Sequence, residues 1–304
     1  MSIIEQAAKR LEELDRAGVT GPWTVVEGFG GGRMEGAGAV RPPHLSEAPR
    51  AAAAPPASEA EPRVDLVLDI EGLQRAGHLV PTDTRSVQAE ELRNIKRPLL
   101  KNARSKNSAD QRLSLILVTS AIPGEGKTFC AINLALSIAT EIDLSVLFID
   151  ADVLRQDAMA RLGIGPGLGL LDLLSDPSLS LDDVVQRTNV PKLSILRAGF
   201  RQNLSNELLA SKAMDQLLQR LAHEHPHQIV VFDAPPLLAT NQARVLAANV
   251  GQVVLLVEAA RTQRHIVQQA FAAVEHCPIV MSVLNKTIPR QSDAGYGYGY
   301  GYGY

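Results

Sequence analysis

The chain has 304 residues, of which 45% are apolar and 21% charged, a composition typical of a protein with a folded domain. Its formal net charge of −3 gives no sign of a nucleic-acid-binding protein, and we predict no nucleic acid partner. Two cysteines exclude a disulfide framework, and no apolar run reaches the roughly 18 residues of a membrane span, so we expect a cytoplasmic protein.

The N-terminal part predicts little regular structure. Residues 1–17 carry apolar side chains at helical spacing and predict a short amphipathic helix. From Gly18 to Arg63 the sequence is rich in glycine, proline and alanine, which bury too little surface to offset the entropy of ordering. We therefore assign residues 18–83 to a disordered linker. Gly28 and Gly30 do not make a dinucleotide fingerprint, because Arg33 stands where the third glycine is needed.

Residues 84–289 predict a single domain. A helix from Val87 to Leu100, interrupted at Pro98, precedes short apolar runs that alternate with amphipathic helices, the longest over residues 206–224. Such an alternation is typical of a parallel sheet that is covered on both faces. We expect an α/β fold with a doubly wound, mostly parallel sheet of P-loop NTPase type.

A phosphate-binding loop follows the first apolar strand of this domain. The sequence Ala121-Ile-Pro-Gly-Glu-Gly-Lys-Thr128 stands between a strand and a helix, as a P-loop requires, with alanine in place of the usual first glycine. In such a loop the lysine neutralises the β and γ phosphates and the threonine hydroxyl is a ligand of Mg²⁺. The predicted nucleotide-binding residues are Pro123, Gly124, Glu125, Gly126, Lys127, Thr128 and Phe129.

Two further strands end in aspartates. Asp150 and Asp152 follow one apolar run, and Asp233 follows another. Because ligands of open parallel sheets gather at the carboxyl ends of the strands, we expect these three carboxylates to face Lys127. Together with Thr128 they are the candidate Mg²⁺ ligands, directly or through water.

The C-terminal residues contain every tyrosine of the chain. Because the first 295 residues have none, tyrosine does not fill the core of the domain. From Gly295 onward glycine and tyrosine alternate without a core-forming pattern, so we assign residues 290–304 to a flexible tail. The tail carries Tyr296, Tyr298, Tyr300, Tyr302 and Tyr304.

The combination of the P-loop, the Asp150-x-Asp152 motif, the strand ending in Asp233-Ala-Pro-Pro and the terminal tyrosine cluster resembles the bacterial tyrosine kinases. Over about residues 86–304 it is most similar to their branch associated with exosortase-type exopolysaccharide loci. The resemblance implies an ATP- and Mg²⁺-dependent protein-tyrosine autokinase that phosphorylates its own C-terminal tyrosines. It also implies a role in the synthesis or export of an extracellular polysaccharide.

The resemblance also implies site residues and partners. Lys127, Asp150 and Asp152 would be catalytic, one of the two aspartates taking the tyrosine proton. Asn285 would contact the adenine edge or, alternatively, only form a turn. Implied partners are a second copy of the chain, a membrane-bound polysaccharide co-polymerase that recruits the kinase to the inner face of the membrane, and a phosphotyrosine phosphatase. The family's subunit-contact motif corresponds here to Glu90, Arg93 and Lys96.

Three positions depart from related patterns. Leu154 stands where many family members carry an arginine, four positions after the first aspartate of the Asp150-x-Asp152 motif, and Arg155 follows it. Lys96 replaces an arginine, and a lysine cannot make the arginine's bidentate contact. Pro123 stands where the related partitioning and septum-placement ATPases carry a second lysine. Two alternative functions stay open: an ATPase of this partitioning or positioning type, and a nucleotide-dependent scaffold with an adhesive tail.

Overall fold

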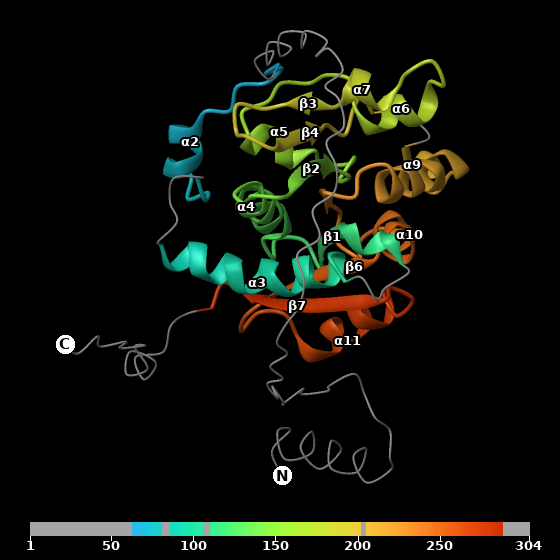
Figure 1. The fold of residues 1–304 in the computed structure, drawn as a ribbon. Coiled ribbons are helices and arrows are strands. Elements are labelled where there is room, and N and C mark those ends of the chain that lie inside the picture. The colour runs from blue at the N-terminus through green and yellow to red at the C-terminus, as the bar shows by residue number, and fades with distance from the viewer. Residues whose placement is uncertain (1–62, 81–85, 106–109, 202–204, 288–304) are drawn as a thin grey trace, which may run out of the picture. The chain divides into compact units, whose positions relative to one another are not determined.

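The computed structural model describes residues 63–80, 86–105, 110–201 and 205–287. These residues form a sheet of seven strands in the order β3-β4-β2-β5-β1-β6-β7 (Figure 1). Every neighbouring pair is parallel except β3 with β4, which confirms the predicted doubly wound, mostly parallel α/β fold. The strands are β1 (Leu115–Ser120), β2 (Ser145–Asp150), β3 (Gln186–Arg187), β4 (Leu193–Leu196), β5 (Gln228–Asp233), β6 (Gln252–Glu258) and β7 (Ile279–Asn285).

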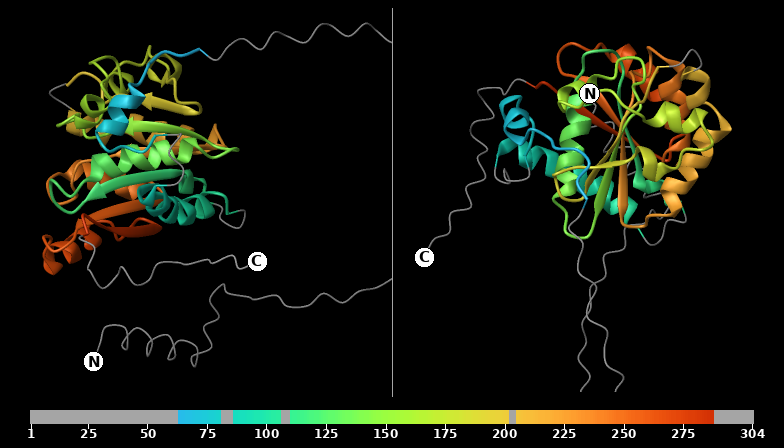
Figure 2. Two further views of the ribbon diagram at one scale, coloured as in Figure 1. Left: turned by 90° about the vertical axis from the view of Figure 1, so that its left-hand side faces the viewer. Right: turned by 90° about the horizontal axis from the view of Figure 1, so that it is seen from above.

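Helices cover both faces of the sheet, which Figure 2 shows between two helical layers in its right-hand view. One layer contains α2 (Ile70–Arg75), α3 (Val87–Ala103), α4 (Lys127–Ala139) and α5 (Asp157–Arg161). The other contains α6 (Leu170–Ser175), α7 (Leu181–Val184), α8 (Ser205–Leu209), α9 (Lys212–His223), α10 (Asn241–Asn249) and α11 (Arg264–Ala272). A short 3₁₀ helix, η1 (Gln111–Ser114), leads into β1.

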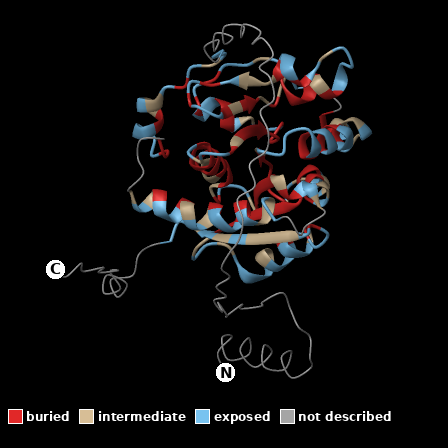
Figure 3. Cartoon of the chain, viewed as in Figure 1, coloured by how far each residue is buried: buried red, intermediate tan, exposed pale blue. Residues whose placement is uncertain are grey.

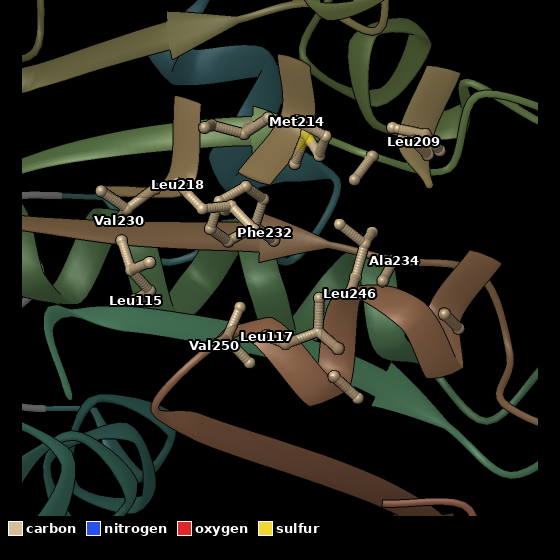
Figure 4. Close-up of a cluster of buried hydrophobic side chains, with 14 of the residues drawn as sticks. Leu115, Leu117, Leu209, Met214, Leu218, Val230, Phe232, Ala234, Leu246 and Val250 are labelled. Carbon is tan, nitrogen blue, oxygen red and sulfur yellow. The ribbon is translucent and has the colours of Figure 1, made fainter. Parts of the chain in front are cut away.

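The central strands are apolar on both faces, as a sheet between two helical layers requires. All six residues of β1 are buried, and so are the last five of β2 and β5. Figure 3 shows this burial along the middle of the sheet, with exposed residues on the outer sides of the helices. In the core on the α9 side of the sheet, Leu115, Val230 and Phe232 pack against Met214 and Leu218 of α9 (Figure 4).

The predicted linker extends too far. Residues 63–80 are folded: Leu66 bridges to Thr188 beside β3, α2 begins at an Asp69 cap, and Leu68 and Leu73 are 2% and 3% exposed. The assignment of residues 18–83 to disorder is therefore wrong for residues 63–80. A helix of six residues is too short to show a periodic pattern, and the stability of the segment comes from apolar side chains buried against α4 and its neighbours.

Two predicted helices have different bounds. Helix α3 runs unbroken through Pro98, because the buried Leu99 and Leu100 keep it packed against the domain. The segment 206–224 forms two helices, α8 and α9, because Ser211 caps α9 by accepting a hydrogen bond from the Met214 N–H.

The predicted N-terminal helix (residues 1–17) and the tyrosine tail (290–304) lie outside the described residues. None of the helices in the described part of the chain combines the length and the apolar character that a membrane span needs.

Candidate active site

The site lies where three adjacent strands end. The order β2-β5-β1 places Asp150 directly beside Asp233, and the loop after Ser120 follows β1 at the same edge. The P-loop and the two strand ends that carry the aspartates, which the sequence predicts to form the nucleotide site, are therefore neighbours in space. Their meeting point is the carboxyl edge of the sheet, where open α/β proteins bind ligands.

The loop of residues 121–126 is a tight turn into α4. Gly124 and Gly126 have φ values of +92° and +95°, in the left-handed region that favours glycine. A Cβ at Gly126 would lie 2.3 Å from the Asn285 side-chain nitrogen, so a larger residue does not fit there. The loop ends at the N-terminus of α4, whose free N–H groups attract phosphate.

Lys127 is buried among the aspartates. Its ammonium nitrogen lies 2.7 Å from Asp152 Oδ2, 3.2 Å from Thr128 Oγ1 and 3.6 Å from Asp233 Oδ1. Burial opposes its charge, but Asp233 and Asp152 outweigh that effect and raise the pKa of Lys127. The ammonium therefore stays positive at neutral pH and holds the carboxylates around it.

Asp150 and Asp233 are buried beside one another, and Lys127 does not fully offset the cost of their negative charge. Burial, together with the neighbouring carboxylates Asp233 and Asp152, raises the pKa of Asp150 well above its ordinary value. Burial also raises the pKa of Asp233 to about 6, although Lys127 acts against it. Asp150 Oδ2 and both Oδ atoms of Asp233 have no hydrogen-bond partner within the described part of the chain.

These orphaned oxygens fit a divalent cation. Mg²⁺ prefers oxygen ligands and usually takes one or two carboxylates together with several waters and substrate phosphates. The described residues contain no group of three His, Cys, Asp or Glu side chains arranged to hold a metal on their own. The residues present thus fit an Mg²⁺ ion that is shared with a nucleotide. The three aspartates are not arranged to bind the ion directly without a nucleotide, which was one of the two predicted possibilities.

The Glu125 side chain holds the P-loop in place through hydrogen bonds, a role that the sequence analysis did not predict. Its carboxylate is 1% exposed and accepts hydrogen bonds from the Ile122 N–H, the Glu258 N–H and the Thr262 hydroxyl. The bonds tie the loop after β1 to the carboxyl end of β6. The side chain of this predicted nucleotide contact therefore points into the protein, which leaves its main chain for a ligand.

Two residues at the end of β7 also hold the P-loop in place. Asn285 Nδ2 donates to the Glu125 carbonyl at 2.8 Å, and Lys286 Nζ donates to the Gly124 carbonyl at 2.7 Å. Lys286 and Arg261 also bind Glu258, and their hydrogen bonds hold the pKa of that carboxyl below its usual range. Asn285 thus lies beside the loop, and its contact with adenine stays a prediction.

The remaining predicted site residues are placed as follows. Pro123 is exposed, whereas the Phe129 ring is half-buried and lies 4.8 Å from the ring of His78. Arg155, which follows Leu154, has an exposed side chain, and its N–H donates to Asp152 Oδ1. The tail tyrosines lie outside the described residues.

The three residues of the predicted subunit contact differ in exposure and in their partners within the chain. Glu90 and Arg93 pair with each other on α3. Lys96, in contrast, is 5% exposed: its ammonium binds the Ser137 carbonyl at 2.8 Å and Glu141 Oε1 at 2.8 Å, at the end of α4. The charge of Lys96 is therefore used within the chain, at the C-terminal end of a helix dipole, and its contact with another subunit stays a prediction.

Fold and site together define a nucleotide-binding protein of the P-loop class, with a glycine loop, a buried lysine and acidic strand ends. No protein-family model matches the sequence. Tyrosine-protein kinase YwqD of Bacillus subtilis is 30% identical over 218 residues, which cover 71% of this chain and 88% of that protein. The chain therefore belongs to the bacterial tyrosine-protein kinases.

Other relatives are longer. The tyrosine-protein kinase etk of Escherichia coli K12 is 32% identical over 60% of this chain, and the putative tyrosine-protein kinase EpsB of Ralstonia nicotianae is 30% identical over 66%. The matches span only 25% and 27% of those two proteins. Among solved structures, the VpsO kinase domain is similar with a TM-score of 0.51 and 29% identity over 66% of this chain and 99% of that one. The kinase domain of Escherichia coli ETK shares the fold, with a TM-score of 0.56 and 23% identity over 75% of this chain and 98% of that one.

Proposed function

We propose that this kinase transfers the γ-phosphoryl group of ATP to the tyrosines of its own C-terminal cluster. The observation that carries the proposal is the convergence of Lys127, Asp150, Asp152 and Asp233 at the end of the P-loop strand. The acceptors are the five tyrosines confined to the last nine residues of the chain.

The residues of the site divide the work of binding and transfer. The loop N–H groups and Lys127 bind the β and γ phosphates, for which the lysine exchanges its contact with Asp152 for phosphate oxygens. Thr128, Asp233 and one of the pair Asp150 and Asp152 would hold Mg²⁺, and the ion would neutralise the charge of the phosphates. Most of the catalysis is positioning and charge neutralisation, as in phosphoryl transfer in general.

The transfer itself needs a proton acceptor. The tyrosine oxygen bonds to the γ-phosphorus, the bond from that phosphorus to ADP breaks, and the phenolic proton passes to a carboxylate. A tyrosine hydroxyl has a pKa near 10, so a carboxylate beside it assists the attack. Asp150 or Asp152 takes this proton, and the other holds the metal ion with Asp233.

The wider role of the kinase follows its family. We propose that tail phosphorylation regulates production or export of an extracellular polysaccharide. The partners would be a second copy of the chain, which receives or supplies the tail, a membrane-bound co-polymerase that recruits the kinase to the inner membrane face, and a phosphotyrosine phosphatase. Exposed Glu90 and half-buried Arg93 on α3, together with Lys96, are the candidates for a contact between copies.

The proposal is tested by incubating the purified full chain with labelled ATP and Mg²⁺ and mapping the phosphate by peptide. We expect phosphotyrosine in the segment 290–304, and its loss in Lys127→Met. Lys101→Met, which removes a solvent-exposed lysine of α3, is the matched control and should label normally. Release of inorganic phosphate alone would indicate a positioning ATPase instead, and neither product would indicate a scaffold.

A further inference from the structure

A hollow of about 250 Å³ lies at the carboxyl end of β4, the strand next to β2. It is smaller than the roughly 300–1,000 Å³ of pockets for drug-sized ligands and suits a single side chain. Because β2 ends at Asp150, the hollow lies one strand away from the candidate active site. The walls come from α5 and its flanks and from the segment after β4, namely residues 156, 159, 160, 164–167 and 197–201.

The hollow is built for an anion. Its lining contains Arg197 and Arg201 and no acidic residue. The Arg197 Nε atom is buried and has no hydrogen-bond partner among the described residues, while its guanidinium packs so closely over Gly167 that a Cβ there would lie 2.5 Å from Nη1. Burial lowers the pKa of Arg197, but an arginine remains charged at neutral pH.

Apart from Gln156, whose amide donates to the Gly199 carbonyl, the rest of the lining is apolar and aromatic. Phe200 is 51% exposed at this hollow, and Met159 and Ile164 face the same space. The position of Phe200 is fixed from behind, because Asp172 Oδ2 accepts hydrogen bonds from the N–H groups of Phe200 and Gly169. A ligand that suits both halves of the lining has an aromatic ring next to a phosphate, that is, an aryl phosphate.

We propose that this Arg197 hollow binds a phosphotyrosine of the C-terminal segment 290–304. The proposal rests on the proposed function, since that function supplies the phosphotyrosine. The guanidinium of Arg197 binds the phosphate, and Phe200 stacks with the ring.

The length of the segment allows this contact. Seventeen residues follow the last described residue, Thr287, and span about 55 Å when extended, whereas β4 and β7 are five strand steps or about 24 Å apart. Successive tyrosines of the repeat are about 7 Å apart in an extended chain. Because β1, which leads into the P-loop, lies three strand steps or about 14 Å from β4, one modified tyrosine held in the hollow would keep a tyrosine two repeats away within reach of the P-loop, so that one modification favours another.

Peptide binding tests this site directly. The protein is the full chain with all five tail tyrosines changed to phenylalanine, without ATP, so that no phosphotyrosine of its own competes. A fluorescent peptide of residues 290–304 with phosphate on Tyr300 is titrated, and its anisotropy gives the dissociation constant. We expect it to bind at least about tenfold more tightly than the unmodified peptide, a difference typical of one hydrogen-bonded charge pair.

Variants locate the bound phosphate. Arg197→Gln should weaken binding about tenfold or more, while the matched control Arg220→Gln, at an exposed position of α9, should not change it. Phe200→Ala should remove the preference for this peptide over one with phosphoserine at the same position. Wild-type ADP affinity and melting temperature of each variant exclude a folding defect.

Several results would overturn the proposal: equal affinity for both peptides, unchanged affinity in Arg197→Gln, or displacement of the peptide by saturating ADP and Mg²⁺, which would put the phosphate on the P-loop. The synthetic peptide separates this test from that of the proposed function. Tail phosphorylation without peptide binding would contradict only the hollow, and peptide binding by a chain that does not modify its tail would contradict only the proposed function.

Discussion

Asp233 is placed to bind a ligand, and its burial lowers the stability of the protein without that ligand. Its pKa rises from the ordinary 3.8 to about 6 in the folded chain, chiefly through burial, so ionisation of Asp233 destabilises the fold, fully so above pH 6. We predict that Asp233→Asn raises the free energy of unfolding at pH 8 by about 1–3 kcal/mol and abolishes transfer.

Denaturant unfolding at pH 8 without nucleotide measures this effect. The matched control is Asp143→Asn, an exposed aspartate in the turn before β2, which should leave stability within about 0.5 kcal/mol. An Asp233→Asn protein less stable than the wild type would mean that the carboxylate stabilises the free protein.

Glu125 acts on nucleotide binding through the loop that it holds. Three hydrogen bonds converge on its carboxylate, and their loss leaves buried donors without partners. We predict that Glu125→Ala lowers ADP affinity at least about tenfold, measured by calorimetry, whereas exposed Glu275→Ala binds ADP normally. Wild-type affinity in Glu125→Ala would show that these hydrogen bonds do not shape the loop.

The charged residues at the centre of the site could be predicted from the sequence, but the residues that hold the P-loop in place could not. Lys127 and the three aspartates could be placed because apolar strands end directly before them, and parallel strands end at one edge. Glu125 and Lys286 act through partners more than a hundred residues away. Those contacts depend on the strand order, which no local pattern contains.

At the scale of elements, the segment 63–80 is part of the domain. Leu73 is 3% exposed in the core shared with α4, so we predict that Leu73→Ala lowers the free energy of unfolding by about 2–4 kcal/mol. Val67→Ala, at a position that is 80% exposed, is the control and should change little. Denaturant unfolding gives both values, and equal stability of the two variants would place the segment outside the cooperative unit.

The same segment carries a pH-sensitive contact with the P-loop helix. His78 is 4% exposed, and its Nδ1 lies 3.1 Å from Asn133 Nδ2 of α4. Burial, and then the charge of Arg161, lower the pKa of His78 below the ordinary 6.5. The unfolded chain therefore binds a proton first, and stability that is complete above pH 6.5 falls as the pH drops below it.

We predict that His78→Gln removes this component. Melting temperatures measured from pH 8 to pH 5 should fall less steeply in the variant than in the wild type, because the other titrating groups are common to both proteins. Identical slopes would mean that the imidazole does not couple to folding.

Most of the elements could be predicted, and the exceptions have local causes. Continuous apolar strands and amphipathic helices predicted the doubly wound sheet, since burial on both faces leaves a clear pattern. The break at Ser211, the unbroken helix through Pro98 and the fold of residues 63–80 depend on a cap or on tertiary packing instead. Propensity alone does not contain that information.

At the scale of the whole molecule, the chain separates a tyrosine-free catalytic domain from a segment that holds every tyrosine. Each phosphate adds about −1.5 to −2 charges, so full modification of five tyrosines would add about −7.5 to −10 to a net charge of −3. The net charge of the fully modified chain is thus several times more negative, so the extent of modification can be measured from the charge.

The most direct test of the account is the number and position of phosphates on the intact chain after reaction with ATP and Mg²⁺, determined by mass spectrometry and peptide mapping. We predict one to five phosphates per chain, all on tyrosines of the segment 290–304, and none in Lys127→Met or in the chain with five tyrosines changed to phenylalanine. A wild-type chain that consumes ATP while its tail stays unmodified, or a Lys127→Met chain that modifies its tail as the wild type does, would contradict it.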